Sequence, residues 1–348
     1  MITIAILGAT GYTALELINL LLRHPEAKIT ALTTRSDENP RVGKVHPSLA
    51  GRLDLRLENL SPKEVAERAE CVFCCLPHKA SAERIPEFLD VGCRVIDLSA
   101  DYRLDDPAVF EKWYETPHPD ADRLGKIPYG LPEFFREEIK TLAGKEKLIA
   151  NPGCYPTSAV AALAPLLAAG MIRPDGIVID SKSGASGAGR AAKQELLFCE
   201  VAEGFKAYGV GTHRHTPEIE QILTKMARRN PSYADRNVEV IFTPHLVPME
   251  RGILTTTYSL PVNPAVTQTE ILETLRVFYK NEPFIRVTDD LPNTRDCRHT
   301  NFVNVTARVV KDRIITVSCL DNLMKGASGA AVQNFNLMYG FPETMGLW

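Results

Sequence analysis

Three features are missing from this 348-residue sequence, and each absence excludes a class of protein. No apolar run approaches the ~20 residues that a membrane-spanning helix needs, since the stretches 17–22 and 160–169 are both short. Charge of one sign is not in excess: the formal net charge is -3, with acidic and basic residues interspersed, so we predict no nucleic-acid partner. Strand-like residues begin at Ile2, which leaves no room for a signal peptide, and we therefore expect a cytoplasmic protein with no membrane contact.

Cysteine is present, but not in a pattern that predicts disulfides or a metal site. There are eight cysteines, and nothing marks the chain as secreted, so we expect thiols. Cys71, Cys74 and Cys75 have the spacing of a metal knuckle, yet they lie in a hydrophobic strand pattern and no second pair matches them. We predict no metal ion.

The first residues read as a strand, a glycine turn and a helix. Ile2–Leu7 is apolar, Gly8 to Gly11 form a tight turn with Thr10 between them, and Tyr12 begins a helical pattern. In a dinucleotide-binding turn the first glycine permits the bend and the second lets the backbone approach a pyrophosphate. Because strands and helices alternate after this turn, we predict a Rossmann-type, doubly wound parallel sheet.

The end of the second predicted strand, Lys28–Thr33, favours NADP over NAD. NAD-binding chains place an acidic residue there for the ribose 2′-hydroxyl, whereas this chain has Thr34, Arg35 and Ser36. A cation with hydroxyls suits a 2′-phosphate. The alternative is that Arg35 is simply a solvated loop residue. Pro77, which follows another buried strand, is expected at the same cofactor-binding edge.

Residues 151–157, NPGCYPT, lie between a buried strand and an apolar helix, and Cys154 is at the turn. We predict a helix over Thr157–Ala169, with Pro156 at its first position and Gly170 at its end. Unpaired N–H groups at a helix start favour a thiolate, so Cys154 is a candidate nucleophile. The alternative is a small buried cysteine with a packing role.

Further polar groups of the chain are candidates for substrate binding and proton transfer. The loop 182–190 (KSGASGAGR) offers backbone N–H groups around Ser183 and Gly184 and a guanidinium at Arg190, a set of donors that suits phosphate. The alternative is a flexible glycine loop that binds no anion. Arg103, after a strand, is an anion clamp or a salt-bridge partner of Asp101. His213 and His215 are candidates for acid and base chemistry.

The second half of the chain is richer in strands, including a hairpin predicted over 302–310 and 313–320. We therefore predict an α+β domain with a mixed or antiparallel sheet. The expected domains are residues 1–150, which bind NADP and are completed by a C-terminal helix in 322–348, and residues 151–321, which carry catalysis and oligomerisation.

The motifs GATGYT, NPGCYPT, SKSGASGAGR, GTHRHTPEIEQ and DNLMKGASGAAVQNFN occur in one order over the full length. In this the chain resembles the N-acetyl-γ-glutamyl-phosphate reductase family of arginine biosynthesis, with kinship to aspartate-semialdehyde dehydrogenases. The resemblance implies Cys154 as nucleophile, the turn Gly8–Tyr12 at the NADP pyrophosphate and Asn322 beside the nicotinamide. It also implies a substrate and phosphate site that includes Asn151, together with Arg103 and Arg190.

The implied reaction is the NADPH-dependent reductive dephosphorylation of an acyl phosphate through a cysteine thioester, with release of phosphate. His213 or His215 would move the proton, and the sequence leaves the choice between them open. It also leaves open a related, carrier-linked aminoadipyl phosphate of lysine biosynthesis as substrate, and a non-catalytic NADP-binding sensor. A homo-oligomer, dimer or tetramer, is expected.

Overall fold

The computed structural model describes residues 1–348, apart from the side chain of residue 142, and the chain divides into two compact units. The first unit comprises Met1–Pro152 and Ala327–Trp348, and the second comprises Gly153–Gly326. Residues 322–326, which the sequence predicted to return to the first domain with the C-terminal helix, make their contacts in the second unit.

The first unit contains a six-stranded parallel sheet in the order β3-β2-β1-β4-β5-β6. Its strands are β1 (Ile2–Leu7), β2 (Ala27–Thr33), β3 (Leu57–Glu58), β4 (Cys71–Cys74), β5 (Arg94–Asp97) and β6 (Leu148–Ala150). In chain order, β2 and β3 lie on one side of β1, and β4, β5 and β6 then follow on its other side. Ligands of such sheets bind at the carboxyl ends of the strands flanking this reversal, so the turn after β1 is at the expected position.

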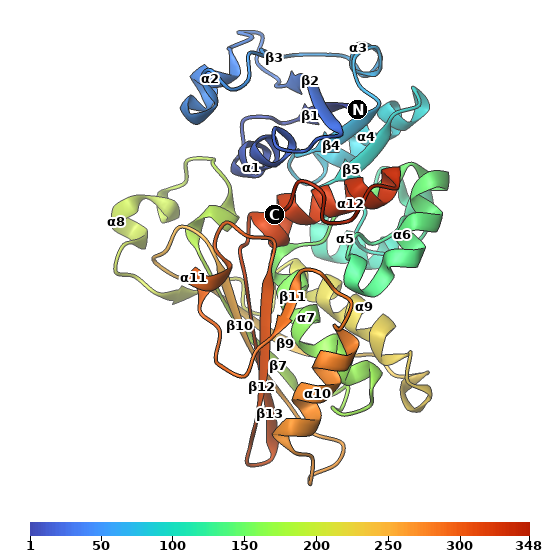
Figure 1. The fold of residues 1–348 in the computed structure, drawn as a ribbon, viewed down its shortest axis with the longest axis vertical. Coiled ribbons are helices and arrows are strands. Elements are labelled where there is room, and N and C mark those ends of the chain that lie inside the picture. Colours follow the sequence, from blue (N-terminus) through green and yellow to red (C-terminus); the bar gives the residue numbers. More distant parts are fainter. The chain divides into compact units, whose positions relative to one another are not determined.

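Helices cover both faces of this parallel sheet. They include α1 (Tyr12–Leu21), α3 (Pro62–Ala66), α4 (Ala80–Asp90), α5 (Pro107–Tyr114), α6 (Pro132–Glu146) and α12 (Gly329–Tyr339). Successive residues of β4 point to opposite faces: Phe73 contacts Phe335 of α12, whereas Val72 packs in a cluster with Phe88 of α4. Figure 1 shows α12, in red, beside α6, so the C-terminal helix completes the first unit.

The second unit contains a seven-stranded mixed sheet in the order β11-β12-β13-β10-β7-β9-β8. Its strands are β7 (Ile177–Ser183), β8 (Lys206–Ala207), β9 (Val240–Leu246), β10 (Ile253–Ser259), β11 (Ile285–Val287), β12 (Val303–Val310) and β13 (Arg313–Leu320). The predicted hairpin is β12–β13, and the pairs β7–β9 and β11–β12 are parallel while the others are antiparallel. The predicted fold class, a Rossmann-type sheet plus an α+β domain, is confirmed.

Helix α7 (Cys154–Ala168) is the centre of the second unit, and residues 155–167 are all buried. It packs against β10 and β13 and against the helices α9 (His215–Ala227) and α10 (Gln268–Phe278). The helix begins at Cys154. The sequence predicted a helical pattern from Thr157, with Pro156 at the first helical position, and this start was wrong. Nothing prevents the earlier start, because the N–H that Pro156 lacks lies in the first turn, where it has no intrahelical partner.

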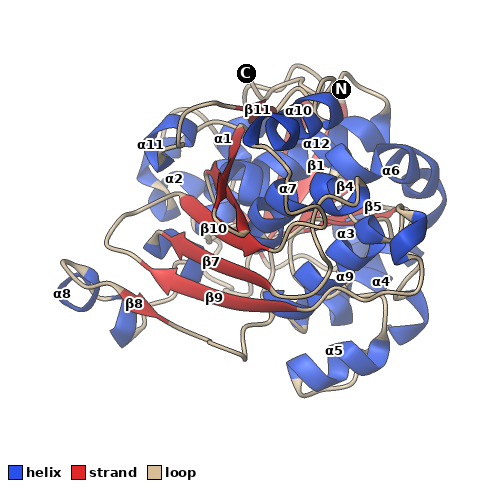
Figure 2. Cartoon of the chain, turned by 90° about the horizontal axis from the view of Figure 1, so that it is seen from below, coloured by secondary structure: helices blue, strands red, loops and turns tan.

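Shorter elements complete the described chain. They are α2 (Val42–Val45), η1 (Pro47–Leu49), η2 (Ala121–Arg123), η3 (Ala185–Ala188), η4 (Gln194–Leu196), α8 (Phe198–Val201), η5 (Pro231–Tyr233), α11 (Thr294–Cys297) and η6 (Met324–Ser328). Figure 2 shows α8 and β8 projecting beyond β9 at one edge of the mixed sheet. Crossing a bilayer takes a long apolar helix, and none of the helices in the described residues has that length and character.

Candidate active site

Cys154 is half-buried and is the first residue of α7, with Gly153 as the N-cap. The Gly153 amide donates to the Glu218 carboxylate on α9 (2.9 Å), and the Thr157 hydroxyl donates to the Gly153 carbonyl (2.9 Å). Backbone on both sides of the N-cap is therefore fixed by buried side chains. A thiol here faces the positive end of the helix dipole, which stabilises its thiolate form.

Gly326 gives Cys154 the room that it occupies. A Cβ atom placed on Gly326 would lie 2.9 Å from the Cys154 Cβ and 3.3 Å from the Asp321 carbonyl oxygen. A separation of 2.9 Å is shorter than real Cβ contacts, so only glycine fits beside Cys154 without a shift of its neighbours. In the sequence Gly326 is one of several small residues near a helix, and nothing marks it as a neighbour of Cys154.

A cavity of about 370 Å³ opens in front of Cys154 within the second unit. It brings together five of the predicted site residues, namely Cys154, Ser183, Gly184, His213 and His215. The other lining residues are Tyr155, Gly187, Ala188, Lys193, Glu195, Leu196, Lys206, Tyr208 and Leu246. The cavity therefore combines a candidate nucleophile, two imidazoles and two ammonium groups, which is the equipment that acyl-phosphate chemistry requires.

One wall of this cavity is an exposed segment, residues 190–208, which we name the arm. The arm contains η4, α8 and β8, and it supplies the two lysines, Lys193 and Lys206. Both lysine side chains are exposed. Another part of the lining is closely packed: Gly184 follows β7, and a Cβ there would lie 2.7 Å from the Glu250 carbonyl carbon.

The two histidines differ in environment. The Nδ1 of His213 accepts a hydrogen bond from the His215 amide (3.1 Å), so the proton of the neutral ring is on Nε2. The His213 ring lies edge-on to Tyr155, and burial, with the Arg214 charge nearby, lowers the pKa of His213 to about 4. His213 is therefore neutral at physiological pH. The ring of His215 lies 4.9 Å from that of His213, centroid to centroid.

Two tyrosines that the sequence analysis missed also line the cavity. The hydroxyl groups of Tyr155 and Tyr208 share a hydrogen bond (2.8 Å). Burial raises the pKa of Tyr208 to about 12, so both phenols keep their protons at neutral pH. Tyr155 and Glu218 lie inside the motifs NPGCYPT and GTHRHTPEIEQ, next to Cys154 and three residues after His215, but neither residue was singled out there. Tyr208 lies in none of the quoted motifs.

Two predicted residues of the second unit are outside the cavity lining. Arg190 is exposed and follows the turn at Gly189, whose φ is +83°. Asn322 is buried, and its amide accepts from the Gly252 N–H (2.7 Å) and donates to the Ser186 hydroxyl (3.0 Å). Asn322 thus holds η3 against the start of β10, and its predicted nicotinamide contact remains a prediction.

The turn after β1 contains two glycines in different surroundings. Gly8 has φ +71°, and a Cβ there would lie 2.6 Å from the Cys75 carbonyl oxygen, so this position requires glycine for packing. Gly11, the N-cap of α1, has nothing within 4 Å of its would-be Cβ. Packing within the protein therefore does not explain a glycine at position 11. A glycine there is consistent with the close approach of a ligand to the backbone. Thr10 and Tyr12 are exposed on the same turn.

The loop after β2 is open to solvent at the same edge of the parallel sheet. The Thr34 hydroxyl accepts from the Ser36 amide (3.3 Å), which folds the loop, while the Arg35 side chain is exposed. Pro77 is also exposed, after β4. Because the strands are parallel, these residues and the turn after β1 share the carboxyl edge, and the donor set fits a phosphorylated dinucleotide.

Arg103 and Asn151 have structural partners within the first unit. The buried Arg103 guanidinium donates to the Asn151 carbonyl (2.7 Å) and the Leu98 carbonyl (2.9 Å). The Asn151 amide donates to the Ala327 carbonyl (3.0 Å) and accepts from Asn334 (2.9 Å). These bonds tie β5, β6 and the start of the C-terminal return together, and substrate contact by either side chain remains a prediction.

Comparison with known proteins places the chain in a family. Residues 3–142 match the family model of the semialdehyde dehydrogenase NAD binding domain, and residues 154–322 match that of the dimerisation domain. N-acetyl-gamma-glutamyl-phosphate reductase of Geobacter metallireducens is 50% identical over 100% of this chain and 98% of its own. That of Rhodopirellula baltica is 47% identical over 99% and 97%. The chain belongs to the N-acetyl-γ-glutamyl-phosphate reductase family.

Solved structures of more distant relatives agree on the fold of this reductase family member. Aspartate semialdehyde dehydrogenase II of Vibrio cholerae, complexed with ASA, superposes with a TM-score of 0.71 at 20% identity over 98% of each chain. Aspartate semialdehyde dehydrogenase of Candida albicans with NADP gives 0.72 at 18% identity, covering 97% of this chain and 98% of that one. At these identities the likeness establishes the two-sheet architecture.

Proposed function

We propose that this protein is an NADPH-dependent N-acetyl-γ-glutamyl-phosphate reductase of arginine biosynthesis. The observation that carries the proposal is the cavity in which Cys154, at the start of α7, faces two histidines and two lysines. Relatives that carry this enzyme's name match the whole chain at about half identity, which favours the acetylglutamyl substrate over the aminoadipyl alternative. It also favours an enzyme over a non-catalytic sensor.

The first half of the reaction is acyl transfer to sulfur. The Cys154 thiolate attacks the γ-carbonyl carbon, the carbon–oxygen bond to phosphate breaks, and phosphate leaves with the electron pair. The product is a thioester on Cys154 and free phosphate. The helix start supports this step because the N-terminal end of a helix favours the thiolate form of a cysteine.

The cofactor is assigned to the first unit. Gly8, Thr10, Gly11 and Tyr12 would hold the pyrophosphate, and the loop Thr34–Ser36 would hold the 2′-phosphate through Arg35. When bound, NADPH supplies the hydride that reduces the acyl carbon to the aldehyde level. Replacing Arg35 with Asp is expected to lower the preference for NADPH over NADH, and an unchanged preference would refute this role.

The two histidines are assigned different tasks. His213 is neutral with its proton on Nε2, which suits it to donate a hydrogen bond to the oxygen of the tetrahedral intermediate. The semialdehyde leaves when the bond between its carbon and the Cys154 sulfur breaks, and the sulfur keeps the electron pair and regains a proton. A ring whose pKa is near 4 is a weak proton carrier, so His215 is the better donor of that proton. We expect His215→Gln to remove one limb of the pH–rate profile. His213→Gln should lower kcat and keep that limb, and the reverse pattern would exchange the two assignments.

Lys193 and Lys206 are proposed to bind the substrate's anionic groups. The substrate carries a carboxylate and a phosphoryl group, and these two ammonium groups line the cavity beside Cys154. We expect Lys206→Met and Lys193→Met to raise the KM for the acyl phosphate by about tenfold or more, as expected when a charged partner is lost. Lys225→Met, on α9, is a control outside the cavity lining and should leave KM unchanged.

A homo-oligomer is supported by the match to a dimerisation domain. We propose a dimer or tetramer that uses the less buried face of the mixed sheet. Alternate residues of β7 and β10 are only partly buried. Ile241 of β9 and Tyr258 of β10, on the two strands that flank β7, are 64% and 38% exposed. Sedimentation of the protein and of an Ile241→Lys variant tests this, because the variant should weaken a dimer that forms through this face.

A cytoplasmic location remains a prediction from the sequence.

The decisive experiment for the proposed function compares substrates and nucleophile variants. Phosphate-dependent oxidation of N-acetylglutamate semialdehyde should exceed that of aminoadipate semialdehyde derivatives, and the opposite preference would refute the substrate assignment. Cys154→Ser should abolish turnover while NADPH binding persists. Cys199→Ser, at an exposed cysteine in the arm that does not line the cavity, is the matched control and should retain activity.

A further inference from the structure

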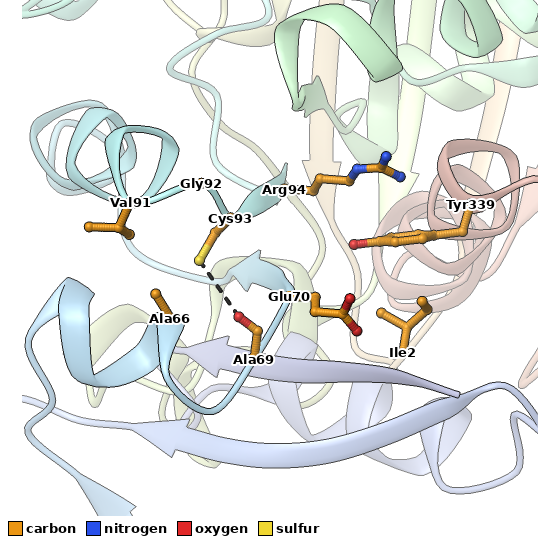
Figure 3. Close-up of a pocket in the computed structure, with 9 residues that line it drawn as sticks. All are labelled: Ile2, Ala66, Ala69, Glu70, Val91, Gly92, Cys93, Arg94 and Tyr339. Atoms are coloured by element: carbon orange, nitrogen blue, oxygen red, sulfur yellow. Dashed lines mark hydrogen bonds between the residues drawn. The ribbon is translucent and has the colours of Figure 1, made fainter.

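A second cavity lies at the amino-terminal edge of the parallel sheet, the edge opposite to the predicted nucleotide turn. Its volume is about 480 Å³, and all its lining residues belong to the first unit. They are Ile2, Ala66, Ala69, Glu70, Val91, Gly92, Cys93, Arg94 and Tyr339 (Figure 3). None of these residues takes part in the reaction proposed above, so the cavity is a separate feature of the molecule.

Two unlike charges face this cavity without neutralising each other. Glu70 precedes β4 and Arg94 begins β5, and the described residues contain no ion pair within 4 Å for either group. The Glu70 carboxylate has only long contacts to Thr3, at 3.5 Å. A carboxylate and a guanidinium in one cleft are expected to bind a ligand that carries both complementary charges, since a singly charged ligand would leave one of them unmatched.

Arg94 is held in position for such a ligand. One of its N–H groups donates to the Met338 carbonyl (3.1 Å), and its guanidinium carbon lies 4.7 Å from the centre of the Tyr339 ring. Figure 3 shows the guanidinium above the ring, with the Glu70 carboxylate on the other side of the ring's hydroxyl end. A guanidinium that stacks on an aromatic ring keeps N–H groups available at its edge for a bidentate carboxylate.

The rest of the cavity wall is apolar. In Figure 3 Val91 and Ala66 lie across the cavity from Arg94 and Tyr339, and the Cys93 thiol is directed to the Ala69 carbonyl oxygen (3.7 Å). A ligand anchored by its charges would therefore place an uncharged body against small aliphatic side chains. This arrangement selects a zwitterion with a short apolar chain.

We propose that this cavity binds a free α-amino acid, with its carboxylate on Arg94, its ammonium on Glu70 and its side chain against Val91 and Ala66. The site is independent of the reductase assignment. Because the proposed contacts come from segments that are together only in the folded chain, we expect the bound amino acid to raise the melting temperature of the protein.

The test uses L-norvaline as probe, with valerate and n-butylamine as analogues that each lack one charge. Saturation-transfer NMR on the full-length protein should give a saturable L-norvaline signal, and each analogue should bind about tenfold more weakly or worse. Glu70→Gln and Arg94→Gln should cause similar losses. Arg84→Gln, which alters an exposed Arg84–Glu87 pair on α4, is the control and should bind normally.

A space-filling variant keeps the test independent of folding. Val91 is 41% exposed at the cavity, so Val91→Trp should fill it and abolish binding without lowering the melting temperature. Equal affinity for the singly charged analogues, normal binding by Val91→Trp, or no saturable binding would each overturn the proposal. Displacement of L-norvaline by NADPH with phosphate would overturn it too, because it would place the probe in the active site; the reductase assignment would stand.

Discussion

Replacing Gly326 with alanine tests whether the position of Cys154 is set by the residue packed against it. The new methyl carbon would lie 2.9 Å from the Cys154 Cβ, whereas carbon atoms in contact prefer about 3.5–4.0 Å. The two atoms must therefore separate by about 0.6–1.1 Å. Helix α7 is buried along its length, so it resists this shift and the strain falls on the first turn, where the thiol is.

The expected cost of Gly326→Ala is larger for activity than for folding. Misplacing a reacting group by about 1 Å lowers the rate by about 10²-fold, while overpacking of this kind costs about 1–3 kcal/mol of stability. The assay is kcat for N-acetylglutamate semialdehyde oxidation, beside the melting temperature and the alkylation rate of Cys154. Alkylation is measured in a Cys199→Ser background, because Cys199 is exposed.

The matched control is Gly144→Ala. Gly144 is in α6, where an added Cβ would meet nothing within 4 Å, so this variant should keep full activity and gain a little stability. If Gly326→Ala folds and retains wild-type kcat and alkylation rate, the reasoning that Gly326 positions the nucleophile is refuted.

Three further predictions concern the nucleotide turn, a buried carboxyl and the N-cap of α7. Gly11→Ala should weaken NADPH binding by about tenfold or more at an unchanged melting temperature, whereas Gly8→Ala should lower the melting temperature; equal effects on folding would contradict the ligand role of Gly11. Burial, with the Asp101 charge nearby, raises the pKa of Asp97 to about 7, so the folded protein keeps a proton that the unfolded chain loses above about pH 4. The contribution of Asp97 to the free energy of unfolding therefore falls as the pH rises from about 4 to about 7. In Asp97→Asn the melting temperature should depend less on pH over this range. An unchanged pH dependence would disprove the raised pKa. Glu218→Ala should lower the melting temperature and the alkylation rate of Cys154, and Glu218→Gln, which still accepts from Gly153, should restore the melting temperature.

Local patterns predicted most of the first unit. The apolar run Ile2–Leu7, the glycines after it and the alternation of strands with helices each follow from short-range rules, and the sheet order agrees with them. The start of α7 was misjudged because the rule that places proline first in a helix outweighed Gly153 as N-cap. Proline is tolerated throughout the first turn, so the pattern alone did not fix the boundary.

The site was less predictable than the fold because its walls come from distant segments. Cys154, His213 and His215 stand out by chemistry, and the cavity contains all three. Lys193 and Lys206, in contrast, look like ordinary surface lysines in sequence, and only the path of the arm brings them to the cavity. Arg103 shows a different limit of sequence reasoning: its bonds to the Asn151 and Leu98 carbonyls could not be foreseen from a cation at a strand end, and its contact with an anion remains a prediction.

The two walls of the active-site cavity differ in what mutation can do to them. Cys154, the proposed nucleophile, begins α7, whose residues 155–167 are all buried and where most substitutions lower stability. The arm, residues 190–208, is exposed over most of its length and places side chains in the same cavity. If the cavity binds the acyl phosphate as proposed, changes in the arm would alter which acyl phosphate is accepted while the thiol and its helix stay intact. Such a division makes substrate preference readily evolvable, and it identifies the arm as the segment to exchange when a reductase of this fold is re-engineered.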